Sequence, residues 1–278
     1  MNIEFHISAE LKGNILAMRM IDSLKKELAD CGHTVDGTSP DICHLFGCWD
    51  GNITTKGNSL HRKRIPYIYS PMGGLQPWNI SEHAIKSNLS MDKYRNVARN
   101  AMAVHACSII EQQNLKQLKI ETDCFVVNNP AVTQSISVGE MTRKLLTIYE
   151  NSLLKHDKHV RNDIREKSEK AISNIDANEM KRQKGVFLDI LQQVYYCQYL
   201  FNRQHLQTSM LQQLAETMID ADYNEDIMAT VLHEQLLENF MSSLEAVMEG
   251  TTNLTEGFMP INSSENRLSE QIRKAIIA

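Results

Sequence analysis

The sequence lacks several features that define whole classes of protein. No run of about 18 apolar residues occurs, so the 278-residue chain has no segment typical of a transmembrane helix. The first ten residues contain no basic start followed by an apolar stretch, so no secretory signal is predicted and we expect a cytoplasmic protein. The formal net charge is only −5, which gives no reason to expect nucleic-acid binding.

Cysteine is too sparse for a disulfide framework, with six in the whole chain. Cys31, His33, Cys43, His44 and Cys48 lie close together in the sequence, which raises the question of a zinc site. Their spacing matches no zinc-ligand pattern, and Cys43 and His44 would point to opposite faces of a strand. We therefore predict buried or half-buried thiols, with no metal and no other cofactor.

Glycine and proline are scarce in the second half of the chain. Eight of the 12 glycines and five of the six prolines precede residue 131. Turn-rich sequence with short apolar runs therefore gives way to long stretches without helix-breaking residues. We predict a domain boundary near residues 133–140, with one domain over residues 1–135 and a second over residues 136–278.

The first part contains an alternation of short apolar runs and helical stretches. Strands are expected at Asn2–Ile7, Thr34–Val35, Ile42–Phe46, Ile65–Tyr69, Ala103–Cys107 and Phe125–Val127. Helices are expected at Ile15–Ala29, Ser81–Arg99 and Ile109–Leu118, with Gly32 as a left-handed cap after the first of them. This alternation predicts an α/β fold with a Rossmann-like, doubly wound parallel sheet.

The second part carries apolar residues at three- and four-residue spacing over most of its length. Helices are expected at Val138–Leu154, Val186–Leu200, Gln204–Ala221 and Ile227–Met248. The charged stretch Asp157–Lys184 is expected as a helix pair or one long helix, and residues 250–266 as a polar, turn-like tail. We predict an all-helical C-terminal domain.

Residues 41–78 place the first candidate site. Two predicted strands end there in turn-forming residues, the first at Gly47 and the second just before Gly73 and Gly74. Ligands of open α/β sheets bind beyond the carboxyl ends of the strands, and glycine lets a ligand approach the backbone closely. We therefore expect a ligand site at these strand ends.

The loop Ser8–Asn14 would face the same crevice. Gly13 and Asn14 precede a predicted helix whose N-terminal amides favour an anion, and Lys12 would add a cation. A single glycine is not a dinucleotide-binding motif, so an ordinary connecting loop explains the segment equally well.

Two tryptophans and one glutamate also follow predicted strand ends. The rings of Trp49 and Trp78 suit stacking on a sugar, and packing as core beneath loops is the structural alternative. Ser108 and Glu111 fit a capping box at the start of a helix, which by itself explains both residues. Glu111 would also be placed to bind a hydroxyl group or to act as a base.

Several short motifs follow one another in a fixed order over about residues 1–133. They are Gly32-His33-Thr34-Val35, Asp41-Ile42-Cys43-His44 with Gly47, Ile65-Pro66, Ser70-Pro71 with Gly73, Pro77-Trp78, Lys86, His105-Ala106-Cys107-Ser108 with Glu111, and Val127-Asn128-Asn129-Pro130. Together they resemble the N-terminal, acceptor-side half of a GT-B glycosyltransferase, most like family 4. The resemblance implies metal-independent transfer and a sugar or nucleotide-sugar ligand. The candidate substrate-binding residues are Gly13, Asn14, His44, Met72, Gly73, Gly74, Trp78 and Glu111, and no catalytic residue is identified.

The chain departs from the family in three respects, the first being that the loop after its first predicted strand lacks the family's usual glycine pair. Met72 stands where the family has a histidine, and methionine is a poor hydrogen-bonding partner. The second part does not resemble a sugar-nucleotide domain with its Glu-x7-Glu motif. Glu238 and Glu245 are one residue too close and lie in a helical pattern, so we take their spacing as coincidence.

Three functions follow as hypotheses. The first is a glycosyltransferase-like protein of surface-polysaccharide or glycan biosynthesis, whose active site is incomplete or is completed by another chain. The second is a non-catalytic binding or scaffold protein on the same shell, with a helical domain that binds a partner protein. The third is an unrelated nucleotide-binding α/β enzyme, because a fold does not fix a function. The basic run His61–Arg64 is expected as a solvated turn, with peripheral contact to acidic lipids or to a phosphorylated substrate as the alternative.

Overall fold

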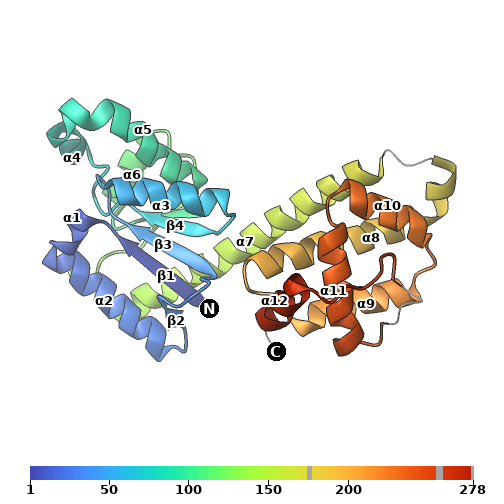
Figure 1. Ribbon diagram of the computed structural model, residues 1–278. Coiled ribbons are helices and arrows are strands. Elements are labelled where there is room, and N and C mark those ends of the chain that lie inside the picture. Colours follow the sequence, from blue (N-terminus) through green and yellow to red (C-terminus); the bar gives the residue numbers. More distant parts are fainter. Residues whose placement is uncertain (174–176, 255–258, 277–278) are drawn as a thin grey trace. The chain divides into compact units, whose positions relative to one another are not determined.

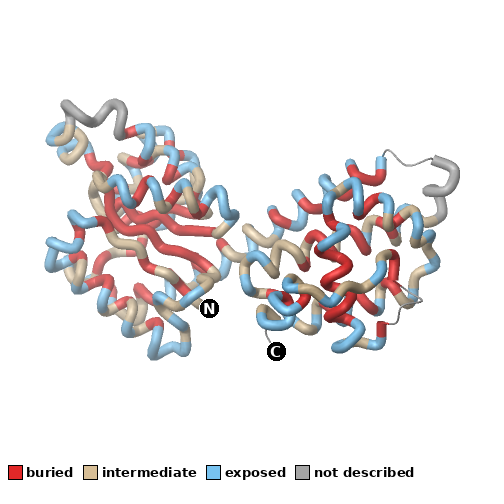
Figure 2. Tube along the Cα trace, viewed as in Figure 1, coloured by how far each residue is buried: buried red, intermediate tan, exposed pale blue. Residues whose placement is uncertain are grey.

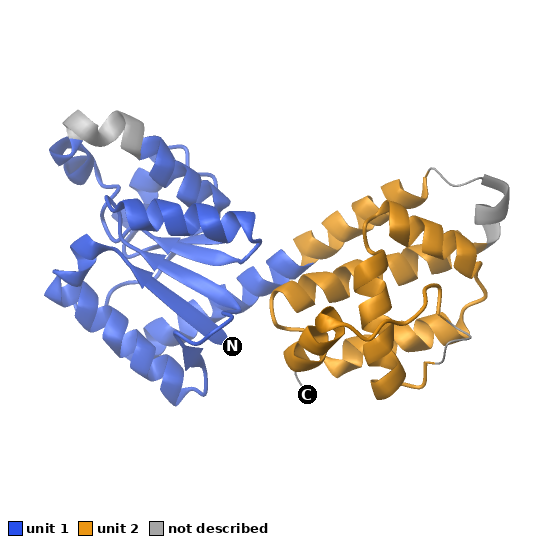
Figure 3. Ribbon diagram, viewed as in Figure 1, with its two compact units in different colours: residues 1–157 blue, residues 158–278 orange. Residues whose placement is uncertain are grey.

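The computed structural model describes residues 1–173, 177–254 and 259–276, and for residues 84–90 and 177–182 it describes the backbone alone. Lys86, one of the residues that carry the resemblance, therefore lies outside the described side chains. The chain divides into two compact units, Met1–Asp157 and Lys158–Ala278 (Figure 3). Helix α7 (Val138–Ile172) begins inside the range predicted for the boundary and continues past residue 157.

Unit 1 contains six parallel strands in the order β2-β1-β3-β4-β5-β6 (Figure 1). The strands are β1 (Asn2–Ile7), β2 (Thr34–Val35), β3 (Ile42–Phe46), β4 (Tyr67–Ser70), β5 (Ala103–Ala106) and β6 (Cys124–Val126). The predicted α/β class with a parallel sheet is confirmed. β4 begins two positions later than predicted because the Ile65 N–H donates to the Leu60 carbonyl (2.9 Å) and so closes the preceding helix.

Helices cover both faces of this sheet. The side chains of Ile42 and Phe46 share a core with α2 (Ile15–Asp30) and the first part of α7. Those of Cys43 and Leu45 pack on the other face, which is covered by α3 (Gly51–Arg62), α5 (Ala84–Asn100) and α6 (Ile109–Gln117). Neighbouring residues of β3 thus point to opposite faces, as strand geometry requires. The central strands are the buried interior of unit 1 in Figure 2.

Helix α3 is absent from the sequence-based prediction. Its sequence, with two glycines, three β-branched residues and two asparagines, has a low helical propensity. Asp50 nevertheless caps its start, and Gly57 lets it approach α5 closely, because a Cβ on Gly57 would lie 3.1 Å from the Val97 methyl groups. Packing against α5 and capping therefore outweigh weak local propensity here.

Gly32 ends α2 in the predicted left-handed conformation, with φ of +83°. The His33 N–H donates to the Leu28 carbonyl (3.0 Å), and the Gly32 N–H donates to the Ala29 carbonyl (2.9 Å). These two bonds form a Schellman cap, which satisfies carbonyl groups that the helix leaves open.

The strand order places the change of winding direction between β1 and β3. Its β2-β1-β3-β4-β5 portion is the order of flavodoxin-like sheets, and it differs from the 3-2-1-4-5-6 order of the dinucleotide-binding Rossmann sheet. In both types, ligands bind beyond the carboxyl ends of the strands at the switch point. We call this side of unit 1 the carboxyl edge; it is formed by the residues that follow Ile7, Phe46, Ser70, Ala106 and Val126.

Unit 2 is helical, and its described residues contain no strand. Beyond the second part of α7 it contains α8 (Ala177–Asn202), α9 (Thr208–Asp220), α10 (Glu225–Glu234), α11 (Glu238–Thr251) and α12 (Arg267–Ala275) around one core. The predicted helical C-terminal part is therefore confirmed. The expected single helix at Ile227–Met248 is wrong, because Leu236 takes a φ of +57° and separates α10 from α11. The helical spacing of apolar residues continues across this break, so the sequence pattern did not reveal it.

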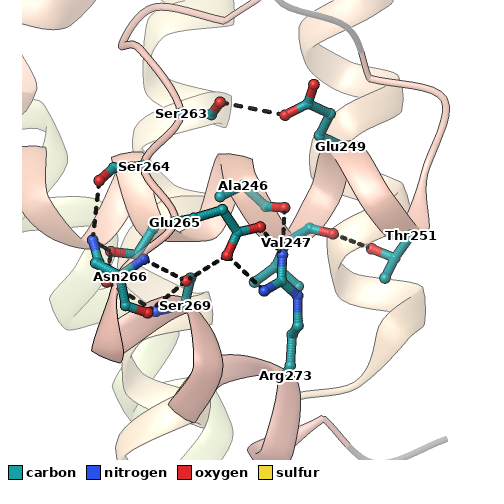
Figure 4. Close-up of polar contacts among 11 residues, drawn as sticks. Ala246, Val247, Glu249, Thr251, Ser263, Ser264, Glu265, Asn266, Ser269 and Arg273 are labelled. Atoms are coloured by element: carbon teal, nitrogen blue, oxygen red, sulfur yellow. Dashed lines mark hydrogen bonds and ion pairs between the residues drawn. The ribbon is translucent and has the colours of Figure 1, made fainter.

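The segment that follows α11 is held by polar contacts (Figure 4). The Arg273 guanidinium donates to the Ala246 carbonyl (3.0 Å) and forms an ion pair with Glu265. Asn266 and Ser269 form a reciprocal capping box at the start of α12, a helix that was not predicted from the sequence. These contacts fix the end of the chain onto α11.

Candidate functional site

The predicted substrate-binding residues differ widely in their access to solvent. Seven of the eight lie at the carboxyl edge of unit 1, and His44 lies within β3. Gly13, Asn14 and Trp78 are exposed, whereas His44 and Glu111 are buried and the remainder are half-buried. The structure therefore gathers most of the predicted residues at one edge but offers only three of them freely to a ligand.

The loops after β1 and β3 are tied to each other. The Ala9 N–H donates to Oδ2 of Asp50 (2.7 Å), and Oδ1 of Asp50 accepts from the Asn52 N–H (2.9 Å). Gly47 lies so close to Ser8 that a Cβ would come within 2.1 Å of the Ser8 hydroxyl. Burial alone would raise the pKa of Asp50, but the two N–H groups lower it overall. The first amide of the turn α1 (Ala9–Lys12) is thus engaged by a carboxylate of the chain itself.

Asp50 was not among the predicted site residues. Its sequence signal is that of an N-cap, an aspartate directly before a helix, but α3 itself was not predicted. Asn14 is likewise an N-cap, since its Oδ1 accepts from the Ala17 N–H (3.0 Å) at the start of α2. Both side chains therefore have a structural role at this edge.

Glu111 holds two backbone segments together. Its Oε1 accepts from the Gly73 N–H (2.6 Å), and its Oε2 accepts from the Cys107 N–H (2.7 Å). Ser108 caps α6 as predicted, accepting from the Glu111 N–H (3.1 Å), but the glutamate reaches Cys107 instead of completing a capping box. Burial raises the pKa of Glu111, and the two N–H groups partly oppose that rise. The carboxylate joins the turn after β4 to the start of α6.

The turn after β4 is closely packed. Met72 adopts a left-handed backbone with φ of +55°, which is strained for this residue type, and its sulfur lies 3.4 Å from that of Cys107. A Cβ on Gly74 would come within 2.3 Å of the Cys48 Cβ. The Trp49 indole N–H donates to the Gly74 carbonyl (2.7 Å). Gly74 therefore allows the chain to pack on itself, whereas Gly73 adopts a φ of +82°, and these two requirements account for the glycines without a ligand.

The two tryptophans have different surroundings. The Trp49 ring stacks on His83 with the centroids 4.6 Å apart and meets the edge of Tyr94, so it packs as part of the unit. The Trp78 side chain, on α4 (Pro77–Glu82), is 61% exposed. Of the two rings, Trp78 is exposed to a partner or a sugar, whereas Trp49 is half-buried.

A chain of hydrogen bonds crosses the sheet beneath α7. Its members are Tyr149, His44, Ser70, His105 and the carbonyl of Val127, and all the side chains are buried. The Tyr149 hydroxyl lies 2.6 Å from His44 Nδ1, and the Ser70 Oγ lies 2.6 Å from His44 Nε2. Ser70 Oγ is also 2.7 Å from His105 Nδ1, and His105 Nε2 is 2.9 Å from the Val127 oxygen. We call this set the histidine chain.

The direction of every proton in the histidine chain follows from its last member. A carbonyl only accepts, so His105 must donate from Nε2 to Val127. Burial lowers the pKa of His105 to about 4 and that of His44 well below its usual value, so both rings are neutral. His105 Nδ1 then accepts from Ser70, which accepts from His44 Nε2, and His44 Nδ1 accepts from Tyr149. Both nitrogens of His44 are therefore engaged within unit 1.

Several exposed apolar side chains follow strand ends of unit 1 in the sequence. Among the described residues, nine large apolar side chains are exposed, and six of these stand at or after the strand ends of unit 1. We call the six the apolar rim: Ile15, Leu16, Trp78, Ile109, Ile110 and Val132. A contiguous exposed apolar patch is typical of an interaction surface, so these six residues are the candidates for one in unit 1.

The structure also bears on three other features considered in the sequence: a metal site, the basic run and a membrane-spanning helix. In the described part of the chain, no group of three or more His, Cys, Asp or Glu side chains is arranged to hold a metal ion. The basic run His61–Arg64 lies exposed at the end of α3. None of the described helices combines the length and apolar character needed to cross a bilayer.

No protein-family model matches this chain, and no curated protein or solved structure matches it at a significant level.

Proposed function

We propose that this protein is a non-catalytic binding or scaffold protein built on a glycosyltransferase-like shell, and that the carboxyl edge of unit 1 takes a protein partner. The observation that carries the proposal is the use of His44 and Glu111. Both ring nitrogens of His44 and both carboxyl oxygens of Glu111 are hydrogen-bonded inside unit 1. A general acid or base must reach the substrate proton that it transfers, and these two groups are buried.

The apolar rim supports a protein partner. A small polar ligand is oriented by a few convergent hydrogen-bonding groups, whereas a partner protein buries apolar surface. At this edge, Ile109 and Ile110 are 64% and 62% exposed in the first turn of α6. The side chains offered to the outside are thus those that a protein surface would cover.

The ordered motifs support the glycosyltransferase-like shell. The segments from Gly32 to Asn129 follow the order of the family in the sequence, and a parallel sheet is the kind of sheet that such a domain contains. Met72, at the position of the family histidine, lies beside the Cys107 sulfur and offers no useful hydrogen bond. This substitution agrees with a shell that has lost its chemistry.

Affinity capture with the tagged full chain tests the proposal. The double variant Ile109→Glu/Ile110→Glu should lose the partner, because charge on the apolar rim opposes its burial. Glutamate is favourable in the first turn of a helix, so α6 itself should be kept. Leu154→Glu is the matched control, since Leu154 is 71% exposed on α7 and lies outside the rim.

The opposite outcome is equally measurable. If the purified wild-type chain alone hydrolyses or transfers sugar from UDP-glucose, UDP-N-acetylglucosamine or GDP-mannose, the non-catalytic function is wrong. Equal capture by the rim variant and by the control would remove the apolar rim as the binding surface.

A glycosyltransferase that is completed by another chain is the second candidate. Gly13 and Asn14 stay exposed at the carboxyl edge, as a shared site would need. Sugar transfer by the captured complex, but not by either protein alone, would favour this candidate over a scaffold.

A further inference from the structure

Positive charge is concentrated on the side of unit 1 opposite the carboxyl edge. We call this side, from which the strand arrows start in Figure 1, the amino edge. Three segments lead into β4, β5 and β6 there, namely residues 61–66, 99–102 and 116–123. They contain six Lys and Arg side chains, all exposed, and two acidic residues, Glu121 and Asp123. We call the six cations the basic edge: Arg62, Lys63, Arg64, Arg99, Lys116 and Lys119.

The three segments lie side by side. The strands β4, β5 and β6 are neighbours in the sheet, so their first residues are spaced by about 5 Å from strand to strand. The Met102 N–H donates to the Tyr67 carbonyl (2.9 Å), and the Thr122 hydroxyl donates to the Ala98 carbonyl at the end of α5 (2.8 Å). Hydrogen bonds thus connect the starts of neighbouring strands, and the cations share one edge.

The basic edge is largely without counter-ions in the chain. With Arg64 set aside, its members form no ion pair within the described part of the chain. Asp123, on the same edge, pairs instead with Lys155 of α7 (2.8 Å). The carboxyl ends of α3, α5 and α6 favour nearby cations, which accounts for single members but leaves their charges exposed to a partner.

Unit 2 contains a long stretch of the opposite charge. Residues 204–266 include 11 acidic residues and no Lys or Arg. Five of these acids lie on α9, in the loop after it and in the first turn of α10; we call them the acidic turn: Glu216, Asp220, Asp222, Glu225 and Asp226. None of the five forms an ion pair with a described residue, and all but the half-buried Glu225 are exposed.

We propose that the basic edge of one copy of this protein binds the acidic turn of a second copy. The chain itself supplies both charged surfaces, whereas its formal net charge of −5 repels a nucleic acid or an acidic bilayer from the rest of the molecule. The contact joins two different surfaces, so it continues from copy to copy until a ring closes or a filament forms. The carboxyl edge lies at the opposite ends of the same strands, and the proposal is independent of the partner assigned to it.

Sedimentation equilibrium of the full wild-type chain at pH 7 tests the proposal. In about 10 mM salt, where charges act over about 30 Å, the average mass should rise with protein concentration. In about 150 mM salt the range falls to about 8 Å, and the dissociation constant should be at least about tenfold higher. A monomer at every concentration up to about 1 mM in the low salt would overturn the proposal.

Two charge-reversed variants identify the surfaces in low salt. Lys63→Glu/Lys119→Glu changes the basic edge alone, and Asp220→Lys/Asp222→Lys changes the acidic turn alone. Each variant should remain monomeric by itself. An equal mixture should associate again, because the intact acidic turn of the first variant meets the intact basic edge of the second. A mixture that stays monomeric would overturn the proposal.

Arg19→Glu/Arg143→Glu is the matched control. Both arginines are exposed, on α2 and α7, which cover the other face of the sheet, and their replacement changes the net charge by the same amount as in the basic-edge variant. The control should associate as the wild type does, and an equal loss in it would show that net charge alone acts. If the wild type stays monomeric but binds phosphatidylserine vesicles or a single-stranded oligonucleotide, and Lys63→Glu/Lys119→Glu does not, the second copy is the wrong occupant.

Discussion

Two sets of buried polar groups, one in each unit, have opposite surroundings. In unit 1, His44 and His105 belong to a chain in which each donor meets an acceptor. In unit 2, Glu245 is buried on α11, and neither carboxyl oxygen has a hydrogen-bond partner among the described residues. Burial raises the pKa of Glu245 to about 9, and the approach of the Ile261 backbone N–H lowers it only in part. A complete chain fixes how strands and helix meet, whereas a lone buried carboxyl costs stability.

The comparison can be measured within one molecule. Both tryptophans, Trp49 and Trp78, lie in unit 1, so tryptophan fluorescence follows the unfolding of that unit. Far-ultraviolet circular dichroism follows the helices of both units. In urea titrations of the full chain, fluorescence therefore reports unit 1, and a circular-dichroism transition that fluorescence does not show reports unit 2.

Removing the middle of the histidine chain should have the largest effect. Ser70→Ala leaves His44 Nε2 and His105 Nδ1 buried without partners, so unit 1 should lose about 4 kcal/mol of stability. Ser168→Ala in unit 2 is the matched control, because the Ser168 hydroxyl donates only to the Ile164 carbonyl of its own helix (2.9 Å). Similar losses for the two variants would show that the chain is not a connected unit.

Replacing the unpartnered carboxyl should stabilise unit 2. Glu245→Met avoids the protonation that folding imposes between pH 4.5 and 7, so at pH 7 the gain should be about 3 kcal/mol. At pH 4.5 this pH-dependent gain should fall below about 0.5 kcal/mol, because the glutamate of the unfolded chain is then half protonated. Glu216→Met, at an exposed position on α9, should change stability by less than about 0.5 kcal/mol. A loss of stability in Glu245→Met would reveal a partner for Glu245.

The two units should respond to pH with opposite signs. The pKa of His105 falls to about 4 in the folded state, so its stabilisation is complete above pH 6.5 and is lost towards pH 4, by about 3 kcal/mol. The raised pKa of Glu245 gives the reverse, a penalty that grows from pH 4.5 to 9. The raised pKa of Glu111 changes the stability of unit 1 with pH in the opposite direction to His105. The difference in stability between wild type and His105→Leu, measured against pH, therefore isolates the contribution of His105. Parallel pH profiles for the two chains would contradict the assignment of that slope to His105.

Alanine substitutions at one glycine of each unit should give the smallest changes in stability, with opposite signs. Gly32→Ala should destabilise unit 1 by about 1 kcal/mol, because φ is +83° there although no atom lies within 4 Å of an added Cβ. Gly185→Ala in α8 should stabilise unit 2 by about 1 kcal/mol, since the added Cβ again meets nothing and alanine favours the helix. Thermal unfolding read by the two signals would check both signs.

Local patterns predicted the elements whose signals are local. β3 was predicted at its observed limits because a buried apolar run ends at Gly47, and the α2 cap was predicted because Gly32 has no Cβ. The helix α3 and the break at Leu236 could not be predicted in this way. One depends on packing against α5, and the other interrupts an apolar pattern that continues on both sides of it.

For the candidate site, too, the positions of the residues could be predicted from the sequence, but their hydrogen bonds could not. The sequence predicted which residues gather at the carboxyl edge, because parallel strands bring their ends together. It could not predict that His44 is hydrogen-bonded inside unit 1, since its partner Tyr149 lies 105 residues further along the chain. It also gave no sign that Glu111 would bond to Gly73, 38 residues earlier.

The sequence by itself determined the kind of structure: a parallel α/β unit followed by helices, read from periodicity and turn residues that act over a few positions. Only the tertiary structure decided what the polar side chains do. It completes the histidine chain and buries Glu245 with no hydrogen-bond partner for its carboxyl oxygens among the described residues. The physical reason is that burial and hydrogen bonding depend on groups distant in the chain, which no local pattern specifies.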